Sequence, residues 1–319
     1  MTIAFVFPGQ GSQAVGMLDA FAGNPVVADI LAQADAALGE PLSEMIAKGP
    51  AESLALTVNT QPAMLVAGYA CCAAWRAAGG PPAVAVAGHS LGEYTALVAA
   101  GALSLEQAVR LVRLRGAAMQ EAVPVGVGAM AAVLGMEAGK VIEGCREAAA
   151  SFGPGSAEVV EAVNFNAPAQ VVIAGHKAAV ERACEKAKQA GAKRALPLPV
   201  SAPFHSTLLA PAGQRLKVAL ANVSFAQPGI SLVNNVDVAI ETEPARIIDA
   251  LVRQASSPVR WVEVVQRLKS MGVDQVIEFG PGKVLTGLIP RIDKSIKAMA
   301  VQDPASLEAA LQAVRGAAA

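Results

Sequence analysis

Short apolar runs alternate with longer amphipathic stretches along most of this chain. The short runs end at turn-forming residues: residues 3–7 stop at Pro8-Gly9, and residues 83–87 lie between Gly79-Gly80-Pro81-Pro82 and Gly88. The predicted strands are 3–7, 83–87, 231–235, 275–279 and 297–301. Apolar positions three to four residues apart predict helices between them, namely 25–38, 62–77, 91–100, 105–121, 206–222, 244–255, 259–271 and 304–315. Such alternation predicts an α/β fold with a mostly parallel sheet covered on both faces.

The stretch from about 125 to 199 has a different order. Its predicted elements are a strand at 126–134, a helix at 137–150, strands at 157–163 and 170–174, a helix at 177–190 and a strand at 194–200. This β-α-β-β-α-β order is a split βαβ arrangement. Pro124 on one side and Pro197, Pro199 and Pro203 on the other mark plausible hinges. We therefore expect a small domain, 125–198, inserted into a larger one formed by 1–124 and 199–319.

The composition is that of a folded protein and excludes several partners. Of 319 residues, 54% are hydrophobic and 16% charged, which argues against disorder. Lys and Arg number 25 against 26 Asp and Glu, so no basic field suggests nucleic acid. The longest charge-free stretch, 53–75, is interrupted by Asn59, Gln61 and Pro62, and the residues after Pro62 are fewer than the ~20 apolar residues of a membrane span. The N-terminus has no basic region typical of a signal peptide. We expect a soluble, cytoplasmic protein with no membrane or nucleic-acid partner.

The cysteines and histidines do not predict a metal site. The four cysteines are Cys71, Cys72, Cys145 and Cys184. None has C-x-x-C spacing, so buried, reduced thiols are expected. The three histidines, at 89, 176 and 205, are too scattered for a metal motif.

Residues 88–92, Gly-His-Ser-Leu-Gly, match the G-x-S-x-G nucleophile elbow. A predicted strand precedes the motif and a predicted helix comes after it, as an elbow requires. The sharp turn exposes the Ser90 hydroxyl, and the glycines remove side chains that would clash there. The helix N-terminus behind Ser90 offers N–H groups to a developing oxyanion. The alternative is a Gly-rich turn in which Ser90 only caps a helix.

A serine nucleophile needs a base, and His205 is the best candidate. It opens a helix after the proposed hinge and comes after the serine in chain order, as in hydrolase-type sheets. The alternative is a packed or capping histidine. His89 should point away from the elbow, and His176 should lie on the surface of the small domain. No Asp or Glu has a convincing place as the third group, so a backbone carbonyl or an amide could orient the imidazole.

Arg115 falls on the apolar face of its helix. Ser104-Leu105-Glu106-Gln107 is a capping-box pattern that starts this helix near Leu105, and Arg115 lies four residues from both Leu111 and Met119. A buried guanidinium needs a carboxylate partner. Spacing alone leaves two interpretations equally open. One is structural, with an internal Asp or Glu as partner or an arginine that reaches solvent; the other is a bidentate contact with a substrate carboxylate.

Together these motifs resemble the malonyl-CoA:acyl carrier protein transacylase family, in the stand-alone form used in bacterial fatty-acid synthesis. The resemblance covers almost the whole chain. It rests on FPGQGSQ at 7–13, TQPA at 60–63, GHSLGEY at 88–94, RLRG at 113–116, NFNAP at 164–168, PFHS at 203–206, VRQ at 252–254, PVRW at 258–261 and EFGPG at 278–282.

The resemblance implies a hydrolase-like α/β core with an inserted ferredoxin-like subdomain. It also implies a role for each matching residue. Ser90 resembles the nucleophile that becomes malonylated, and His205 its base. The main-chain carbonyl of Gln254 is implied as the partner of the imidazole, and the N–H groups of Gln10 and Leu91 as the oxyanion hole.

Further residues are implied in substrate binding. Arg115 resembles the residue that pairs with the malonyl carboxylate, while Gln10, Phe204 and Asn166 are implied as its neighbours in the pocket. The implied reaction moves malonyl from malonyl-CoA to the phosphopantetheine thiol of acyl carrier protein by a ping-pong route, with no cofactor and no metal. We expect a monomer. The carrier proteins of this family's systems are acidic, so a basic dock is expected; the candidates are Lys186, Lys188, Lys193 and Arg194, although these residues could equally form a solvated helix face.

Two other functions fit parts of the sequence. A serine esterase or thioesterase would use the same elbow, but it has no use for a cation beside its acyl pocket. A nucleotide-binding module is suggested by residues 9–14, which match a loose G-x-G-x-x-A. Pro8 and the lack of a ribose-binding acid after a clear second strand argue against it.

Overall fold

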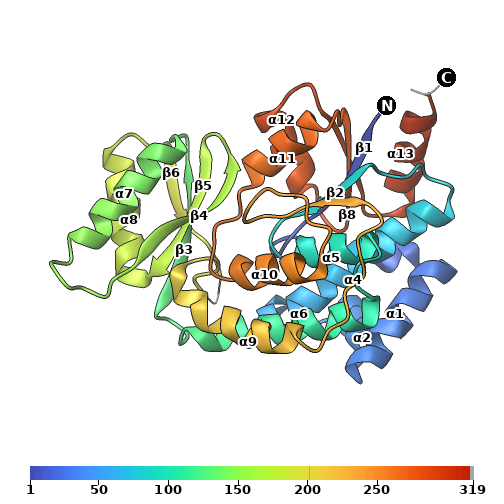
Figure 1. The fold of residues 1–319 in the computed structure, drawn as a ribbon, viewed down its shortest axis with the longest axis horizontal. Helices are drawn as coiled ribbons and strands as arrows, with labels where there is room; N and C mark the ends of the chain where they lie inside the picture. Colours follow the sequence, from blue (N-terminus) through green and yellow to red (C-terminus); the bar gives the residue numbers. More distant parts are fainter. Residues whose placement is uncertain (201, 317–319) are drawn as a thin grey trace.

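The computed structural model describes residues 1–200 and 202–316 and contains two β-sheets (Figure 1). Position 201 and residues 317–319, part of the expected segment 199–319, lie outside the described residues. The first sheet is parallel, with the strand order β7-β2-β1-β8-β9. Its strands are β1 (Ile3–Phe7), β2 (Ala85–Gly88), β7 (Ser231–Val233), β8 (Gln275–Phe279) and β9 (Lys297–Val301). The predicted parallel α/β core is confirmed.

Helices cover both faces of this sheet because its strands are apolar on both sides. In β1, Ile3, Phe5 and Phe7 enter one apolar core, and Ala4 and Val6 enter the other. The first core is packed by α1 (Pro25–Leu38), α2 (Leu42–Lys48), α3 (Ala51–Ala55), α4 (Thr57–Ala77), α5 (Gly92–Ala99), α6 (Leu105–Ala122), α9 (Ala210–Leu220), α10 (Pro244–Gln254) and α13 (Pro304–Gly316). The second is packed by α11 (Trp261–Ser270) and α12 (Val284–Ile292). Within the described residues, none of these helices is both long and apolar enough to cross a lipid bilayer.

The second sheet is antiparallel, with the order β4-β5-β3-β6. Its elements are β3 (Gly128–Leu134), α7 (Ala138–Ala150), β4 (Val160–Ala167), β5 (Gln170–His176), α8 (Lys177–Gln189) and β6 (Arg194–Pro197). The predicted β-α-β-β-α-β order is therefore correct. One face packs on α7 and α8, which lie together at the left of Figure 1, and the opposite face contributes Met130, Val172 and Ala174 to the core of the parallel sheet.

The structure extends one predicted helix and adds three. Helix α4 begins at Thr57 rather than at 62, so Pro62 lies inside the helix and does not start it. The hydroxyl of Thr60 donates to the carbonyls of Leu54 and Leu56, which secures the turn before the proline. The short helices α2, α3 and α12 were not predicted. The seven and five residues of α2 and α3 are too few to show a period, whereas α12 has an apolar face, Leu285, Leu288 and Ile289, that the prediction missed.

The fold brings the ends of β1 and β2 together. The two strands are parallel neighbours in which Phe7 pairs with Gly88, so both chains leave the sheet at the same edge. A Cβ atom on Gly92 would lie 2.0 Å from the Phe7 carbonyl oxygen, and one on Gly88 would lie 1.9 Å from the carbonyl carbon of Gly92. Glycine is therefore required at both positions, and this close approach places the turn at Ser90 beside the segment after β1.

Candidate active site

Ser90 lies in the turn between β2 and α5 with a left-handed backbone, φ 53°. This conformation is strained for a residue with a Cβ atom, and it aims the side chain out of the turn. Asn235, which comes after β7, fixes the turn from behind. Its Oδ1 accepts from the Ser90 N–H at 2.7 Å, and its Nδ2 donates to the Gly88 carbonyl at 2.7 Å. The predicted elbow therefore exists, and it is tied to the neighbouring strand.

His205 is the partner of the serine. Its Nε2 lies 2.6 Å from Ser90 Oγ, and its Nδ1 lies 2.9 Å from the backbone carbonyl of Gln254. A carbonyl can only accept, so Nδ1 must carry the proton, and Nε2 is left free to accept from the serine hydroxyl. Burial and the nearby Arg115 cation lower the pKa of His205 to about 3, which keeps the imidazole neutral.

Arg115, on α6, is 1% exposed and reaches the same serine. Its Nη1 donates to Gln61 Oε1 at 2.8 Å, and its Nη2 donates to Gln254 Oε1 at 2.9 Å and to Ser90 Oγ at 3.2 Å. The guanidinium also lies 5.3 Å from the ring centre of Tyr94. Among residues 1–200 and 202–316, no carboxylate forms an ion pair with it. A buried cation held by neutral amides is ready to receive an anion.

The arrangement can generate a nucleophile next to an anion-binding group. Ser90 Oγ donates its proton toward His205 and accepts from Arg115, so the cation stabilises negative charge that develops on the oxygen. Leu91 lies at the start of α5, where backbone N–H groups have no partner within the helix. Gln10 lies just past β1, beside the elbow. A Cβ atom on Gly9 would lie 2.8 Å from the His89 carbonyl oxygen, which indicates how closely the two segments approach.

Ser90 and His205 line a cavity of about 120 Å³. Its lining comes from the turns after β1 and β2, helix α6, strands β3 and β4, and the segment after β6: Gln10, His89, Ser90, Arg115, Met130, Asn164, Leu198, Val200, Phe204 and His205. Of the residues that the sequence implied in binding, Gln10, Arg115 and Phe204 line this cavity. Asn166 does not. Its Oδ1 lies 2.8 Å from His89 Nε2, and Asn164 of the same strand lines the cavity in its place.

Sequence reasoning missed a buried polar layer beneath the cavity. Glu93, Asn235 and the side chain of Gln254 are each 1% exposed or less and are joined by hydrogen bonds. Gln61, fully buried on α4, completes the set around Arg115. Burial raises the pKa of Glu93 to about 7. The sequence held one usable signal, because Glu93 is the single charged residue in the mostly apolar stretch 91–100.

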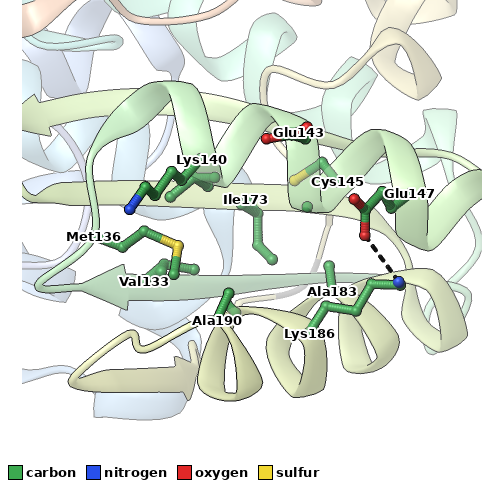
Figure 2. Close-up of a pocket in the computed structure, with 13 residues that line it drawn as sticks. Val133, Met136, Lys140, Glu143, Cys145, Glu147, Ile173, Ala183, Lys186 and Ala190 are labelled. Atoms are coloured by element: carbon green, nitrogen blue, oxygen red, sulfur yellow. Dashed lines mark hydrogen bonds and ion pairs between the residues drawn. The ribbon is translucent and has the colours of Figure 1, made fainter.

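A larger cavity, of about 230 Å³, lies between α7 and α8 in the antiparallel subdomain (Figure 2). Cys145 lies at this cavity, where burial raises its pKa to about 12, so the thiol stays protonated and unreactive. Lys186 forms an ion pair with Glu147 at 3.0 Å there, so this member of the proposed basic dock already has an acidic partner. This cavity therefore has no activated nucleophile, whereas the 120 Å³ cavity contains the Ser90–His205 pair.

The fold and the site define the class of the protein. The site is a Ser–His pair at the edge of a parallel sheet, and an antiparallel subdomain lies beside it. Residues 4–307 match the family model of the acyl transferase domain. The chain is 52% identical over 309 residues to the malonyl CoA-acyl carrier protein transacylase of Salmonella typhimurium, covering 97% of this chain and 98% of the relative. The Bacillus subtilis protein of that name is 44% identical, covering 98% and 97%.

Solved structures agree. An acyl-carrier-protein S-malonyltransferase from Burkholderia pseudomallei is 61% identical, with a TM-score of 0.94, covering 98% of this chain and 100% of that one. A type II PKS acyl-carrier protein has been solved in complex with its malonyl-transacylase; the matching chain is 49% identical, with a TM-score of 0.94, covering 98% of this chain and 100% of that one. The chain belongs to the family of malonyl CoA-acyl carrier protein transacylases.

The environment of His205 predicts its titration. Because burial and the Arg115 cation hold its pKa far below the usual 6.5, the imidazole should stay neutral from pH 8 down to pH 5. Histidine-selective NMR should therefore record His205 ring signals that do not move over this range, with the signals assigned by their loss in His205→Asn. A titration centred near pH 6.5 would contradict the assigned environment.

Proposed function

We propose that this protein transfers malonyl from malonyl-CoA to the phosphopantetheine thiol of acyl carrier protein through a malonyl ester of Ser90, which supplies extender units for fatty acid synthesis. The observation that carries the proposal is Arg115, a buried cation 3.2 Å from the nucleophile with no ion-pair partner among the described carboxylates. The malonyl group carries a free carboxylate that could serve as the ion-pair partner of Arg115. The names of the relatives, and the solved complex of a transacylase with its carrier protein, support the same substrate and partner.

In the first half-reaction, Nε2 of His205 takes the proton of Ser90 Oγ as the oxygen attacks the thioester carbonyl. The N–H groups of Gln10 and Leu91 would stabilise the oxyanion of the tetrahedral intermediate. The C–S bond then breaks, and the CoA sulfur leaves with the proton held by His205. The Gln254 carbonyl steadies the imidazole while it is charged.

In the second half-reaction the roles reverse. His205 takes the proton of the carrier's pantetheine thiol, and the sulfur attacks the malonyl ester. The C–O bond breaks, and the proton passes to Ser90 Oγ, which restores the enzyme. No metal or cofactor takes part in either step.

We further propose that residues 125–198 act as a subdomain that forms one wall of the cavity, since Met130 and Asn164 come from its strands. Phe204 would limit the space at the malonyl α-carbon. Asn166 would act on substrate through His89, to which it is bonded. We also propose that the protein works as a monomer, in the cytoplasm.

Ser90→Ala should abolish covalent labelling by malonyl-CoA, because Ser90 Oγ is the atom aligned with a base. Intact mass spectrometry after mixing is the measurement. Ser206→Ala is the matched control, since Ser206 is also buried near His205 but its hydroxyl donates to the Pro203 carbonyl; it should still be labelled. An adduct that persists in Ser90→Ala would remove Ser90 from the mechanism.

Arg115→Ala should remove the preference for malonyl-CoA over acetyl-CoA. Truncating one partner of a buried charge pair costs about 2–5 kcal/mol, so the ratio of the two kcat/KM values should fall at least ~30-fold. Arg113→Ala is the control on the same helix, because its guanidinium pairs with Glu40 at 3.0 Å and should not affect the ratio. An equal loss for both substrates in Arg115→Ala would make the arginine structural and would defeat the assignment.

Phe204→Ser should admit methylmalonyl-CoA. The ring lines the cavity, and an extra methyl group in a filled site costs about 1–3 kcal/mol. The kcat/KM for methylmalonyl-CoA relative to malonyl-CoA should therefore rise ~5-fold or more. Phe204→Leu, which keeps most of the volume, should change the ratio little. If Phe204→Ser leaves the ratio at the wild-type value, another residue sets this limit.

A further inference from the structure

Glu93, in the first turn of α5, is a buried acid that takes no direct part in the two half-reactions. It is 1% exposed and lies beneath the nucleophile turn. One of its oxygens, Oε2, accepts from the Asn235 N–H at 2.9 Å and from Gln254 Nε2 at 3.0 Å. Both partners also hold Ser90: Asn235 through the Ser90 N–H, and Gln254 through the Ser90 carbonyl at 3.0 Å.

The contacts of Gln254 fix the orientation of its amide. Its nitrogen faces two acceptors: the Ser90 carbonyl, and Glu93 Oε2, the oxygen that also accepts from the Asn235 N–H. Its oxygen therefore faces Arg115 Nη2, which can only donate. If the amide were flipped, its oxygen would face the oxygens of Ser90 and Glu93, and its NH2 group would face the N–H groups of Arg115. Glu93 thus helps to fix the Gln254 amide with its oxygen toward the Arg115 guanidinium.

Gln254 also connects the two halves of the site. Its backbone carbonyl accepts from His205, while its side chain holds Arg115. Glu93 contacts neither of these two residues through a hydrogen bond, and its carboxylate lies behind the amide. It therefore acts on the buried cation through the amide, without occupying the donors of Arg115 that a substrate carboxylate needs.

We propose that Glu93 is a positioning residue for acyl-group selection, acting through the amide of Gln254 to hold Arg115 in place for the malonyl carboxylate. The inference rests on the proposed function. It predicts that an acceptor must stand at the position of Glu93 Oε2, and that neither side-chain volume nor negative charge there is sufficient.

Three substitutions separate these properties. Glu93→Gln keeps the length and an acceptor but loses the charge. Glu93→Met keeps the length without an acceptor, and Glu93→Asp keeps the charge but withdraws it by one methylene. The matched control is Glu278→Met, because Glu278 is also a buried glutamate, but it accepts from Leu285 and Thr286 at the start of α12.

The measurement is the ratio of kcat/KM for malonyl-CoA over acetyl-CoA, with thermal unfolding recorded for each variant. Glu93→Gln should stay within ~3-fold of the wild-type ratio, whereas Glu93→Met and Glu93→Asp should lower it ~10-fold or more. Glu278→Met should lower the unfolding temperature without changing the ratio. If Glu93→Met does not fold, the contrast between the Gln and Asp variants decides.

Equal malonyl-to-acetyl ratios in Glu93→Gln and Glu93→Asp would overturn the proposal. A lowered ratio in Glu93→Gln with a wild-type ratio in Glu93→Asp would also overturn it, because the effect would then depend on charge. The proposed function is judged separately, by intact mass spectrometry of the wild-type protein after mixing with malonyl-CoA. If wild type forms no malonyl adduct, that function fails. If wild type forms the adduct but the variants do not differ as stated, only the role of Glu93 fails.

Discussion

The site depends on a guanidinium that is buried beside a serine and has no ion-pair partner within the described part of the chain. Burying a cation is unfavourable unless hydrogen bonds and nearby charge compensate it. Here two glutamines supply the hydrogen bonds: Gln61 at one terminal nitrogen of Arg115 and Gln254 at the other. Glu93 lies behind Gln254 and is bonded to its amide rather than to the cation. The result is a cation that the fold can tolerate and that still gains from an incoming anion.

The same cation influences the catalytic pair. Burial and this cation together lower the pKa of His205, so the imidazole is neutral and able to accept a proton. The cation also contacts the oxygen that must become the nucleophile. A substrate carboxylate that neutralises Arg115 would make protonation of the imidazole easier as the serine attacks. Selection of the acyl group and activation of the serine are therefore electrostatically linked.

Much of this could be predicted from sequence, because local patterns encode it. The strand, turn and helix around Ser90 result from glycines that the close packing requires, and the Ser104 cap and apolar stripe of α6 place Arg115 on its buried face. Periodicity predicted the two sheets. It missed α2 and α3, which are too short to show a period, and the apolar face of α12 was overlooked. The buried layer was missed for a different reason. Asn235 and Glu93 are 142 residues apart in the chain, and Gln254 and Glu93 are 161 apart, so only the folded topology brings them together. The placement of Asn166 against His89 rather than in the cavity likewise depends on a contact across 77 residues.

The central claim is that the substrate carboxylate fills the place left open at Arg115. A crystal structure of the protein after reaction with malonyl-CoA, with the ester trapped on Ser90, tests this claim most directly. The account predicts that the malonyl carboxylate accepts hydrogen bonds from the Arg115 guanidinium, while the amide of Gln254 keeps its contact with Glu93. A malonyl ester whose carboxylate points away from Arg115, toward solvent or another residue, would contradict it.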